Sequence, residues 1–321
     1  MYEEEKPKCI YYFGNNLIWC KNSFITGNRF YLMILAFISY TIPFILFLVI
    51  IFQSKESSYL FTKIILFILY LLQIYSTFRA GCTDPGILPK QYLVYLENKK
   101  LERRCIINGH LINLKYCISC DFFIPPRCHH CSKCDNCVQK FDHHCGWLGT
   151  CIGIRNYKFF YLLIFCLMIE DIYQIAFCLY FLLYNIKNIK NDKKTTLKII
   201  ISISIIILYD ILFLFFFLGK LFIIHTYLCI TNLTFYEYIK KKFKLVPGFN
   251  PYNKNFFNNF THIFCKKSRK TRIFDKLDIN LYIEKEKEKD KVKNLDKIIN
   301  NKTLTTDDNF HIKKNSEDKI F

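Results

Sequence analysis

The sequence lacks two features that would place it in common soluble classes. It begins MYEEEKPK, which is polar and acidic, so the pattern of a cleavable secretory signal is missing. Disulfide scaffolds are secreted behind such a signal, so the 16 cysteines are not expected to form a disulfide framework. A basic, aromatic RNA-binding motif is also missing. We therefore expect no nucleic-acid partner, and metal-binding cysteines in a reducing compartment.

The hydrophobic residues are concentrated in long blocks. They make up 52% of 321 residues, with 33 phenylalanines and 22 tyrosines among them. A soluble chain of this length would form about two domains, with apolar residues at helical or strand spacing. The net charge is +19, and basic residues flank the apolar blocks and fill the C-terminal region. This pattern predicts a membrane protein whose basic segments meet anionic lipid head groups.

Four apolar segments are long enough to cross a bilayer as helices, which takes about 20 residues. They cover residues 30–52, 59–78, 159–186 and 199–218, the last with an apolar continuation to Ile230. The short link between the first two predicts a helical hairpin. The predicted fold class is an α-helical integral membrane protein with four transmembrane helices. A cytosolic, mostly irregular, zinc-binding Cys-rich domain lies between the second and third.

Basic residues also predict the orientation. The loop after the second span and the region after the fourth are rich in lysine and arginine, and four spans place both on the side of the N-terminus. The positive-inside rule puts that side in the cytosol, of an endomembrane (Golgi or ER) or of the plasma membrane. The third loop disagrees, because it carries Lys187, Lys190, Lys193 and Lys194. The larger basic total and the need for reduced thiols favour cytosolic N- and C-termini.

The chain therefore divides into six predicted parts. The last is a low-complexity run of lysine, glutamate, aspartate and asparagine, which is typical of disorder. In chain order the parts are a cytosolic N-terminus (1–29), the first two transmembrane helices (30–79), the Cys-rich zinc domain (80–156), the third and fourth transmembrane helices (157–230), a cytosolic C-terminal domain (231–275) and the tail (276–321).

The Cys-rich domain has the spacing of metal ligands. A Cys-x2-Cys step lets two thiolates bind one tetrahedral zinc, and such steps occur at Cys117/Cys120, Cys131/Cys134 and Cys134/Cys137. Residues 117–151 contain eight cysteines and four histidines, which is enough for two zinc ions with candidates left over. The alternative is buried structural cysteines without metal, which so polar a loop does not favour.

The run Asp142-His143-His144-Cys145 holds an acid, two imidazoles and a thiol. A thiol is a good nucleophile only as a thiolate, and an adjacent imidazole can take its proton. A carboxylate can then orient that imidazole, as in a catalytic triad, while the other histidine binds metal. The alternative interpretation makes Cys145 another zinc ligand.

This region resembles the Cys-rich domain of the DHHC family of protein S-acyltransferases (palmitoyltransferases). The resemblance rests on Pro125-Pro126-Arg127, His130-Cys131-x2-Cys134-x2-Cys137-x4-Asp142-His143-His144-Cys145-x-Trp147 and Cys151-x-Gly153-x2-Asn156-x3-Phe160. Outside it stand Asp84-Pro85-Gly86, Thr234-Phe235-Tyr236-Glu237, Asn250-Pro251-Tyr252 and Asn259. With the four predicted spans, which fit the number usual in the family, the resemblance covers roughly residues 30–265. The sequence departs from the family pattern at Gly146, usually proline, Thr150, usually asparagine, and Phe235, usually threonine.

The resemblance implies which residues do what. It implies two structural Zn²⁺ ions, one held by Cys117, Cys120, His130 and Cys137 and the other by Cys131, Cys134, His144 and Cys151. Cys145 is then the nucleophile, His143 its base and Asp142 the orienting acid, while Cys105, Cys128 and His129 have no assigned role. The implied enzyme is a protein-cysteine S-palmitoyltransferase. It transfers a long-chain acyl group from palmitoyl-CoA, through acyl-Cys145, to cysteines of membrane-associated proteins at the bilayer.

Two other functions remain as alternatives. One is a non-catalytic, zinc-stabilised membrane scaffold, and the other is a metal transporter, which clustering of the ligands in a loop disfavours. Three acidic residues fall inside the predicted spans: Glu170, Asp171 and Asp210. Such residues face a bundle interior, and we expect them to bond serine, threonine or tyrosine of neighbouring spans. The alternative is that they shape a cavity.

Overall fold

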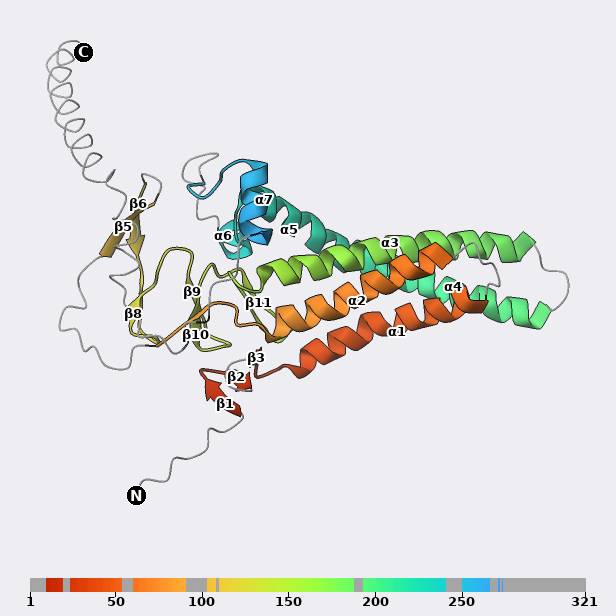
Figure 1. Ribbon diagram of the computed structural model, residues 1–321, viewed down its shortest axis with the longest axis horizontal. Coiled ribbons are helices and arrows are strands. Elements are labelled where there is room, and N and C mark those ends of the chain that lie inside the picture. Colours follow the sequence, from red (N-terminus) through yellow and green to blue (C-terminus); the bar gives the residue numbers. More distant parts are fainter. Residues whose placement is uncertain are drawn as a thin grey trace, which may run out of the picture.

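The computed structural model describes residues 10–19, 24–53, 60–90, 103–107, 110–187, 193–240 and 250–265, with residues 271 and 273. Within these ranges, four helical runs are long and apolar enough to cross a membrane. They are α1 (Tyr31–Gln53), α2 (Leu60–Cys82), α3 (Tyr157–Lys187) and a fourth run of α4 (Lys193–Phe213), the π-helical turn η2 (Leu214–Leu218) and α5 (Gly219–Thr231). Together they form an elongated bundle with the Cys-rich region at one end (Figure 1). The predicted integral membrane fold with four helices is confirmed.

The helices bury apolar side chains, several of them aromatic, between them and turn other apolar side chains outward. Phe44 and Phe47 of α1 and Phe177 of α3 lie in one buried cluster, where Phe47 and Phe177 meet edge to face at 5.6 Å. The exposed side chains include Ile34, Leu46, Phe67, Leu183 and Ile205. Lipid tails accommodate such side chains, and a helix satisfies its own backbone hydrogen bonds in lipid. The uninterrupted apolar runs therefore form helices without a polar face.

The fourth span contains a π-helical turn in its middle. Its apolar stretch runs from Leu197 to Thr231, so the predicted continuation to Ile230 belongs to the same span. A Cβ at Gly219 would lie 2.8 Å from the carbonyl oxygen of Leu214, so glycine lets the wider turn close. Such single π turns often occur at functional sites.

Short antiparallel strands joined by turns build the Cys-rich region. The strands are β4 (Ile87–Leu88), β5 (Arg103–Ile107), β6 (His110–Leu114), β7 (Tyr116–Cys117), β8 (Phe122–Phe123), β9 (His129–Cys131), β10 (Asn136–Val138), β11 (His143–Cys145) and β12 (Thr150–Ile152). One sheet has the order β4-β10-β9, and β5-β6, β7-β8 and β11-β12 form hairpins. The strands are two to five residues long, so turns and side-chain groups rather than extended sheets hold this region together.

An N-terminal sheet, which the sequence did not lead us to expect, packs on the Cys-rich region. It is a meander of β1 (Ile10–Phe13), β2 (Asn16–Trp19) and β3 (Phe24–Gly27). The backbone nitrogen of Asn15 donates to the carbonyl of Cys134 at 2.9 Å. Ile18 and Ile25 are buried with Cys134 in one cluster. The N-terminal segment is therefore part of the same packed unit as the cysteines.

Two short helices follow the last span. α6 (Phe235–Ile239) begins at Thr234, and α7 (Phe256–Phe264) packs against α5 (Figure 1). The Thr234 side chain accepts from the backbone nitrogen of Glu237, and the Glu237 side chain accepts from that of Thr234, which is a capping box. This cap fixes the direction in which the chain leaves the membrane. The predicted tail, residues 276–321, lies outside the described residues.

Candidate active site

Strand alternation separates two groups of candidate metal ligands. Successive residues of a strand point to opposite faces, so His130 and Cys131 of β9 point to opposite sides and join different groups. The groups are Cys117, Cys120, His130 and Cys137, and Cys131, Cys134, His144 and Cys151, with the ligand atoms of each group within 4.8 Å of one another. The structure thus brings together the eight residues named from the sequence, in the same two sets.

Each group is one imidazole surrounded by three thiols. In the first, His130 Nδ1 lies 3.4 Å from Cys120 Sγ and 3.9 Å from Cys137 Sγ. In the second, His144 Nδ1 lies 3.3 Å from Cys134 Sγ and 3.7 Å from the Sγ atoms of the other two cysteines. All six cysteines are free of disulfides. Three thiols and one imidazole at these separations match the donor set of a closed, tetrahedral structural site.

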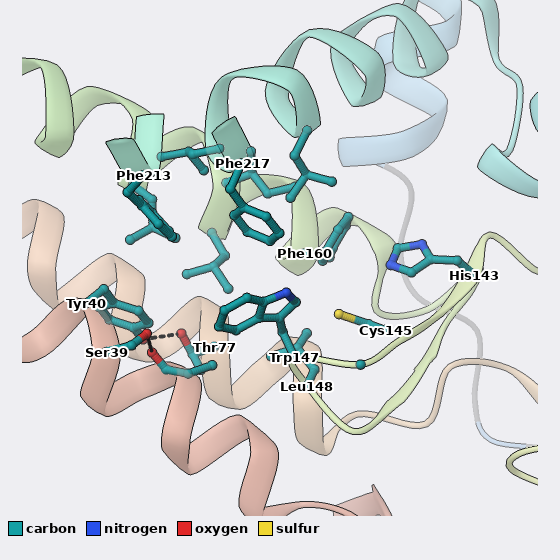
Figure 2. Close-up of a pocket in the computed structure, with 17 residues that line it drawn as sticks. Ser39, Tyr40, Thr77, His143, Cys145, Trp147, Leu148, Phe160, Phe213 and Phe217 are labelled. Atoms are coloured by element: carbon teal, nitrogen blue, oxygen red, sulfur yellow. Dashed lines mark hydrogen bonds between the residues drawn. The ribbon is translucent and has the colours of Figure 1, made fainter. Parts of the chain in front are cut away.

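The same alternation divides the Asp-His-His-Cys run. In β11, His143 and Cys145 are two residues apart and share one face, while His144 points to the other. His144 lies opposite Cys151 of β12 in the register, which completes the second group. His143 and Cys145 instead line an apolar cavity. Figure 2 shows both side chains at one end of it.

Asp142 and His143 form a hydrogen-bonded pair. His143 Nδ1 donates to Asp142 Oδ2 at 2.7 Å, and the Asp142 side chain is 2% exposed. The backbone nitrogen of Phe235 donates to Asp142 Oδ1 at 2.8 Å. Burial acts to lower the pKa of His143, but the hydrogen bond to Asp142 and the neighbouring Cys145 outweigh it and raise that pKa to about 10. Burial acts to raise the pKa of Asp142, but the bond from His143 outweighs it, so that pKa is lowered. The arrangement stabilises an imidazolium beside Cys145.

The cavity runs from Cys145 into the helix bundle. Its volume is about 250 Å³, and its lining is almost wholly apolar: Ala36, Leu148, Phe160, Leu163, Ile164, Leu167, Phe213, Phe217, Leu218 and Leu221, with Trp147. At its far end lie Ser39, Tyr40 and Thr77 (Figure 2), where the hydroxyls of Tyr40 and Thr77 are 2.6 Å apart. Phe213 and Phe217 flank or lie within η2, so the π turn shapes one wall. The cavity can hold an unbranched hydrocarbon chain whose head meets Cys145.

Arg127 connects the Cys-rich region to the segment after the last span. Its Nε donates to Glu237 Oε1 at 2.8 Å and its Nη2 to Glu237 Oε2 at 2.7 Å, a bidentate pair. Its guanidinium also lies 4.2 Å from the ring centroid of Tyr252. Asn232 donates to the carbonyl of Tyr252 at 2.7 Å. Three motifs that are far apart in sequence therefore meet in one network, which holds α6 and Phe235 against Asp142.

The Asp-Pro-Gly and Asn156 elements tie α2 to the beginning of α3. Asp84 Oδ1 accepts from the backbone nitrogens of Gly86 and Ile87 at 2.8 Å each, and Arg155 pairs with Asp84 Oδ2. Asn156 Nδ2 donates to the carbonyls of Ala80 and of Cys151, both at 2.9 Å. These bonds set the position of the hairpin carrying Cys145 relative to the membrane helices.

The three departures from the family pattern have little effect on these contacts. A Cβ at Gly146 would meet nothing within 4 Å. Phe235 lacks the threonine hydroxyl, yet its backbone supplies the bond to Asp142. Thr150 is fully buried, and within the described residues its hydroxyl has no hydrogen-bond partner. The hydrogen-bonded Asp142–His143 pair is therefore assembled without the side chains that these three positions usually carry.

Sequence reasoning missed several residues around the site. His225 of α5 lies with its ring centroid 5.8 Å from that of His143, and no local motif pointed to it. His129, which had no assigned role, stacks on Tyr236 at 4.1 Å. The acids in the spans do not follow our expectation either. Glu170 accepts from Gln174 of its own helix, and Asp171 and Asp210 each keep one buried oxygen without a partner among the described residues.

The chain also matches known proteins in sequence. The family model described as DHHC palmitoyltransferase matches residues 110–242. Over 286 residues the chain is 32% identical to mouse "Palmitoyltransferase ZDHHC18", covering 78% of this chain and 71% of the mouse protein. It is 30% identical to Arabidopsis thaliana "Probable protein S-acyltransferase 2", covering 82% and 69%. Against "Probable protein S-acyltransferase 5" of the same plant, identity is 31% over 61% of this chain, which spans only 44% of that relative.

Proposed function

The chain belongs to the DHHC palmitoyltransferase family, and from this premise we propose that it transfers a long-chain acyl group, such as palmitoyl, from acyl-CoA to cysteine thiols of membrane-associated proteins. One observation carries the proposal above the others. Cys145 lies beside the hydrogen-bonded His143–Asp142 pair and opens onto an apolar cavity inside the helix bundle. A scaffold has no need of a nucleophile, a base and a hydrocarbon-sized cavity at one point.

The first half-reaction acylates Cys145. His143 takes the proton of the Cys145 thiol, and the thiolate attacks the carbonyl carbon of the acyl-CoA thioester. The new carbon–sulfur bond forms as the bond to CoA breaks, and the CoA sulfur leaves with the proton from His143. Asp142 holds the imidazole through Nδ1, so that Nε2 is the nitrogen available for this transfer.

The second half-reaction passes the acyl group on. A substrate cysteine gives its proton to His143 and attacks the acyl-Cys145 thioester, which releases the Cys145 thiol and leaves a thioester on the substrate protein. The acyl chain remains in the cavity during both steps. Because Cys145 and the Tyr40–Thr77 pair lie at opposite ends of the cavity, the distance between them sets the length of acyl chain that fits with its carbonyl at Cys145.

The two Cys/His groups are proposed to hold structural Zn²⁺. Their donor sets fit the metal, since each offers three thiols and one imidazole with no carboxylate or open position. Bound zinc would supply positive charge that keeps the thiols deprotonated and would cross-link β9, β11 and β12. The catalytic residues proposed here, Asp142, His143 and Cys145, are outside both groups.

We further propose that the Cys-rich region and both termini face the cytosol. This orientation is supported by the excess of basic residues in 80–156 and 231–275. It is also supported because free thiols persist only in a reducing compartment. Cytosolic acyl-CoA then reaches Cys145 at the membrane surface, where acyl chains of the bilayer and the cavity meet. We also retain, as part of this proposal, the division of the chain into six parts that the sequence predicted.

Acyl labelling of the purified protein tests the proposal. With a labelled long-chain acyl-CoA, wild-type protein is expected to acquire hydroxylamine-sensitive label, which peptide mass mapping assigns to Cys145. Cys145→Ser should acquire none and should fail to label a substrate protein, although its metal content is unchanged. Cys265→Ser, which removes an exposed thiol outside the site, is the matched control and should label normally. Hydroxylamine-sensitive label on Cys145→Ser and its substrate excludes the proposed mechanism.

A further inference from the structure

His225 is a buried imidazole that the proposed acyl transfer does not use. Its side chain is 1% exposed, and its ring lies among Phe160, at a centroid distance of 5.0 Å, and Phe235, at 5.9 Å. The hydroxyl of Tyr157 lies 3.2 Å from its Nδ1. That contact fixes the orientation of the ring and leaves Nε2 as the nitrogen open to another partner.

His225 converges with Asp142 and His143. The three residues offer one carboxylate oxygen and two imidazole nitrogens that all lie within 4.8 Å of one another, the separation that also holds within the two Cys/His groups. Two of these ligands come from the beginning of the β11 hairpin and the third from α5, so the set exists only in the folded bundle. Sequence spacing gives no sign of it.

The chemistry of this set differs from that of the two Cys/His groups. Two imidazoles and a carboxylate suit borderline divalent ions such as Zn²⁺, and three protein ligands leave an open coordination position. Outer contacts that orient such ligands are present, since Tyr157 meets His225 Nδ1 and the Phe235 nitrogen donates to Asp142. We propose that Asp142, His143 and His225 form a third site, specific for divalent transition-metal ions such as Zn²⁺.

This third site must be weaker than the other two. It offers three ligands instead of four, and an ion has to displace the proton shared between His143 Nδ1 and Asp142 Oδ2, which are 2.7 Å apart. It therefore fills only at free zinc concentrations above those that saturate the Cys/His groups. His143 also lines the apolar cavity next to Cys145, so the third site adjoins the proposed nucleophile.

Binding of an ion at the third site has a consequence for catalysis, which rests on the proposed function. An ion bound to His143 removes the base that takes the proton of Cys145, so free zinc inhibits acyl transfer reversibly. The two structural ions stay in place during this inhibition, because their ligands belong to other groups. The same metal then has a supporting role at two sites and an inhibitory role at the third.

Equilibrium dialysis against buffered zinc tests the site without requiring activity. The detergent-solubilised full chain, with both Cys/His groups loaded, is expected to bind a third equivalent. Cys145→Ser should bind it too, since that thiol is not a ligand. His225→Gln should stop at two equivalents, and so should His143→Gln, which leaves α5 intact and shows that the loss is not a folding defect of one variant. Cys229→Ser, which changes another buried α5 side chain next to Tyr157, is the matched control and should bind three.

Inhibition of Cys145 acylation supplies the second readout. The half-inhibitory free zinc concentration, taken relative to the zinc-free rate of each protein, should rise at least about tenfold in His225→Gln and stay unchanged in Cys229→Ser. A wild-type protein that binds only two equivalents, or a third equivalent that survives in both His225→Gln and His143→Gln, overturns the site. The wild-type protein could also bind a third equivalent that is lost in His225→Gln and yet show no acyl transfer. That result supports the site and refutes only the proposed function.

Discussion

His144 and Cys145 are neighbours in β11, yet they face opposite sides of the β11–β12 hairpin. His144 Nδ1 lies 3.3 Å from Cys134 Sγ in the second Cys/His group, whereas Cys145 lines the apolar cavity. The alternation is a property of extended backbone, so neither side chain can be repositioned alone. The second Cys/His group and Cys145 are therefore linked through a single peptide unit.

Cys151→Ala should abolish acylation although it leaves Asp142, His143 and Cys145 unchanged. Cys151 lies opposite His144 in the hairpin, and its loss leaves the second group with three ligands. We expect one metal equivalent to be lost, a lower melting temperature and little or no acylation of Cys145. Elemental analysis and acyl labelling on the same sample check this, with Cys265→Ser as control. A variant that has lost metal yet labels at the wild-type rate would contradict the link.

His143→Gln should slow acylation while leaving both Cys/His groups loaded. The side chain is proposed to take the thiol proton, and loss of a general base typically costs about a hundred- to ten-thousand-fold in rate. His143 belongs to neither Cys/His group, so these groups should keep two metal equivalents. Single-turnover labelling with acyl-CoA measures the rate. A loss of less than about tenfold would mean that another group takes the proton.

Two glycines near Cys145 should differ in how strongly substitution by alanine destabilises the protein. At Gly146 the added Cβ meets nothing within 4 Å, so the change in stability should stay within about 0.5 kcal/mol. Gly149 has a φ of +65°, and its Cβ would lie 2.2 Å from the carbonyl oxygen of Arg29, so Gly149→Ala should cost more than about 1 kcal/mol. Thermal unfolding of the two variants compares them. Equal losses would show that the turn is more adaptable than its geometry indicates.

Tyr40→Ala should lengthen the acyl chain that the protein accepts. Tyr40 and Thr77, whose hydroxyls are 2.6 Å apart, line the end of the cavity opposite Cys145, and removing the Tyr40 ring enlarges the cavity at that end. Competition between acyl-CoAs of increasing length measures the preference. Tyr75→Ala, which removes an exposed tyrosine of α2, should keep the wild-type preference. An unchanged length profile in Tyr40→Ala would place the limit elsewhere.

Arg127→Lys should destabilise the protein although the charge is kept. Arg127 makes two hydrogen bonds to Glu237, and the two side chains are 10% and 3% exposed. A lysine cannot form this fork, and disrupting a buried pair costs about 3 kcal/mol. Thermal unfolding of Arg127→Lys, Glu237→Gln and the double variant measures the coupling. Additive losses would show that the pair does not act as a unit.

The sequence predicted what depends on local pattern. Continuous apolar runs predicted the four spans, because lipid tolerates such runs only as helices. The Cys-x2-Cys spacings and the family resemblance named the two ligand sets that the structure brings together. Their roles and that of Cys145 stay predictions until the variants are made.

Long-range contacts could not be predicted in this way. His225 reaches His143 only because α5 returns to the Cys-rich region, and the Tyr40–Thr77 contact joins two different helices. The N-terminal strands carry aromatic and apolar residues without clear alternation, and what stabilises them is packing of Ile18 and Ile25 against the cysteines. The intramembrane acids were visible in the sequence, but their partners depend on helix rotation, which composition does not specify.

The packing of the N-terminal sheet imposes an order on biosynthesis. Asn15 and Asn16 bond the backbone of Lys133 and Cys134, 118 residues further along the chain. During translation these contacts can form only after the cysteine loop has left the ribosome. Loop closure over such a distance is slow. Until these contacts form, the cysteines that the sheet covers are open to chaperones and to metal delivery.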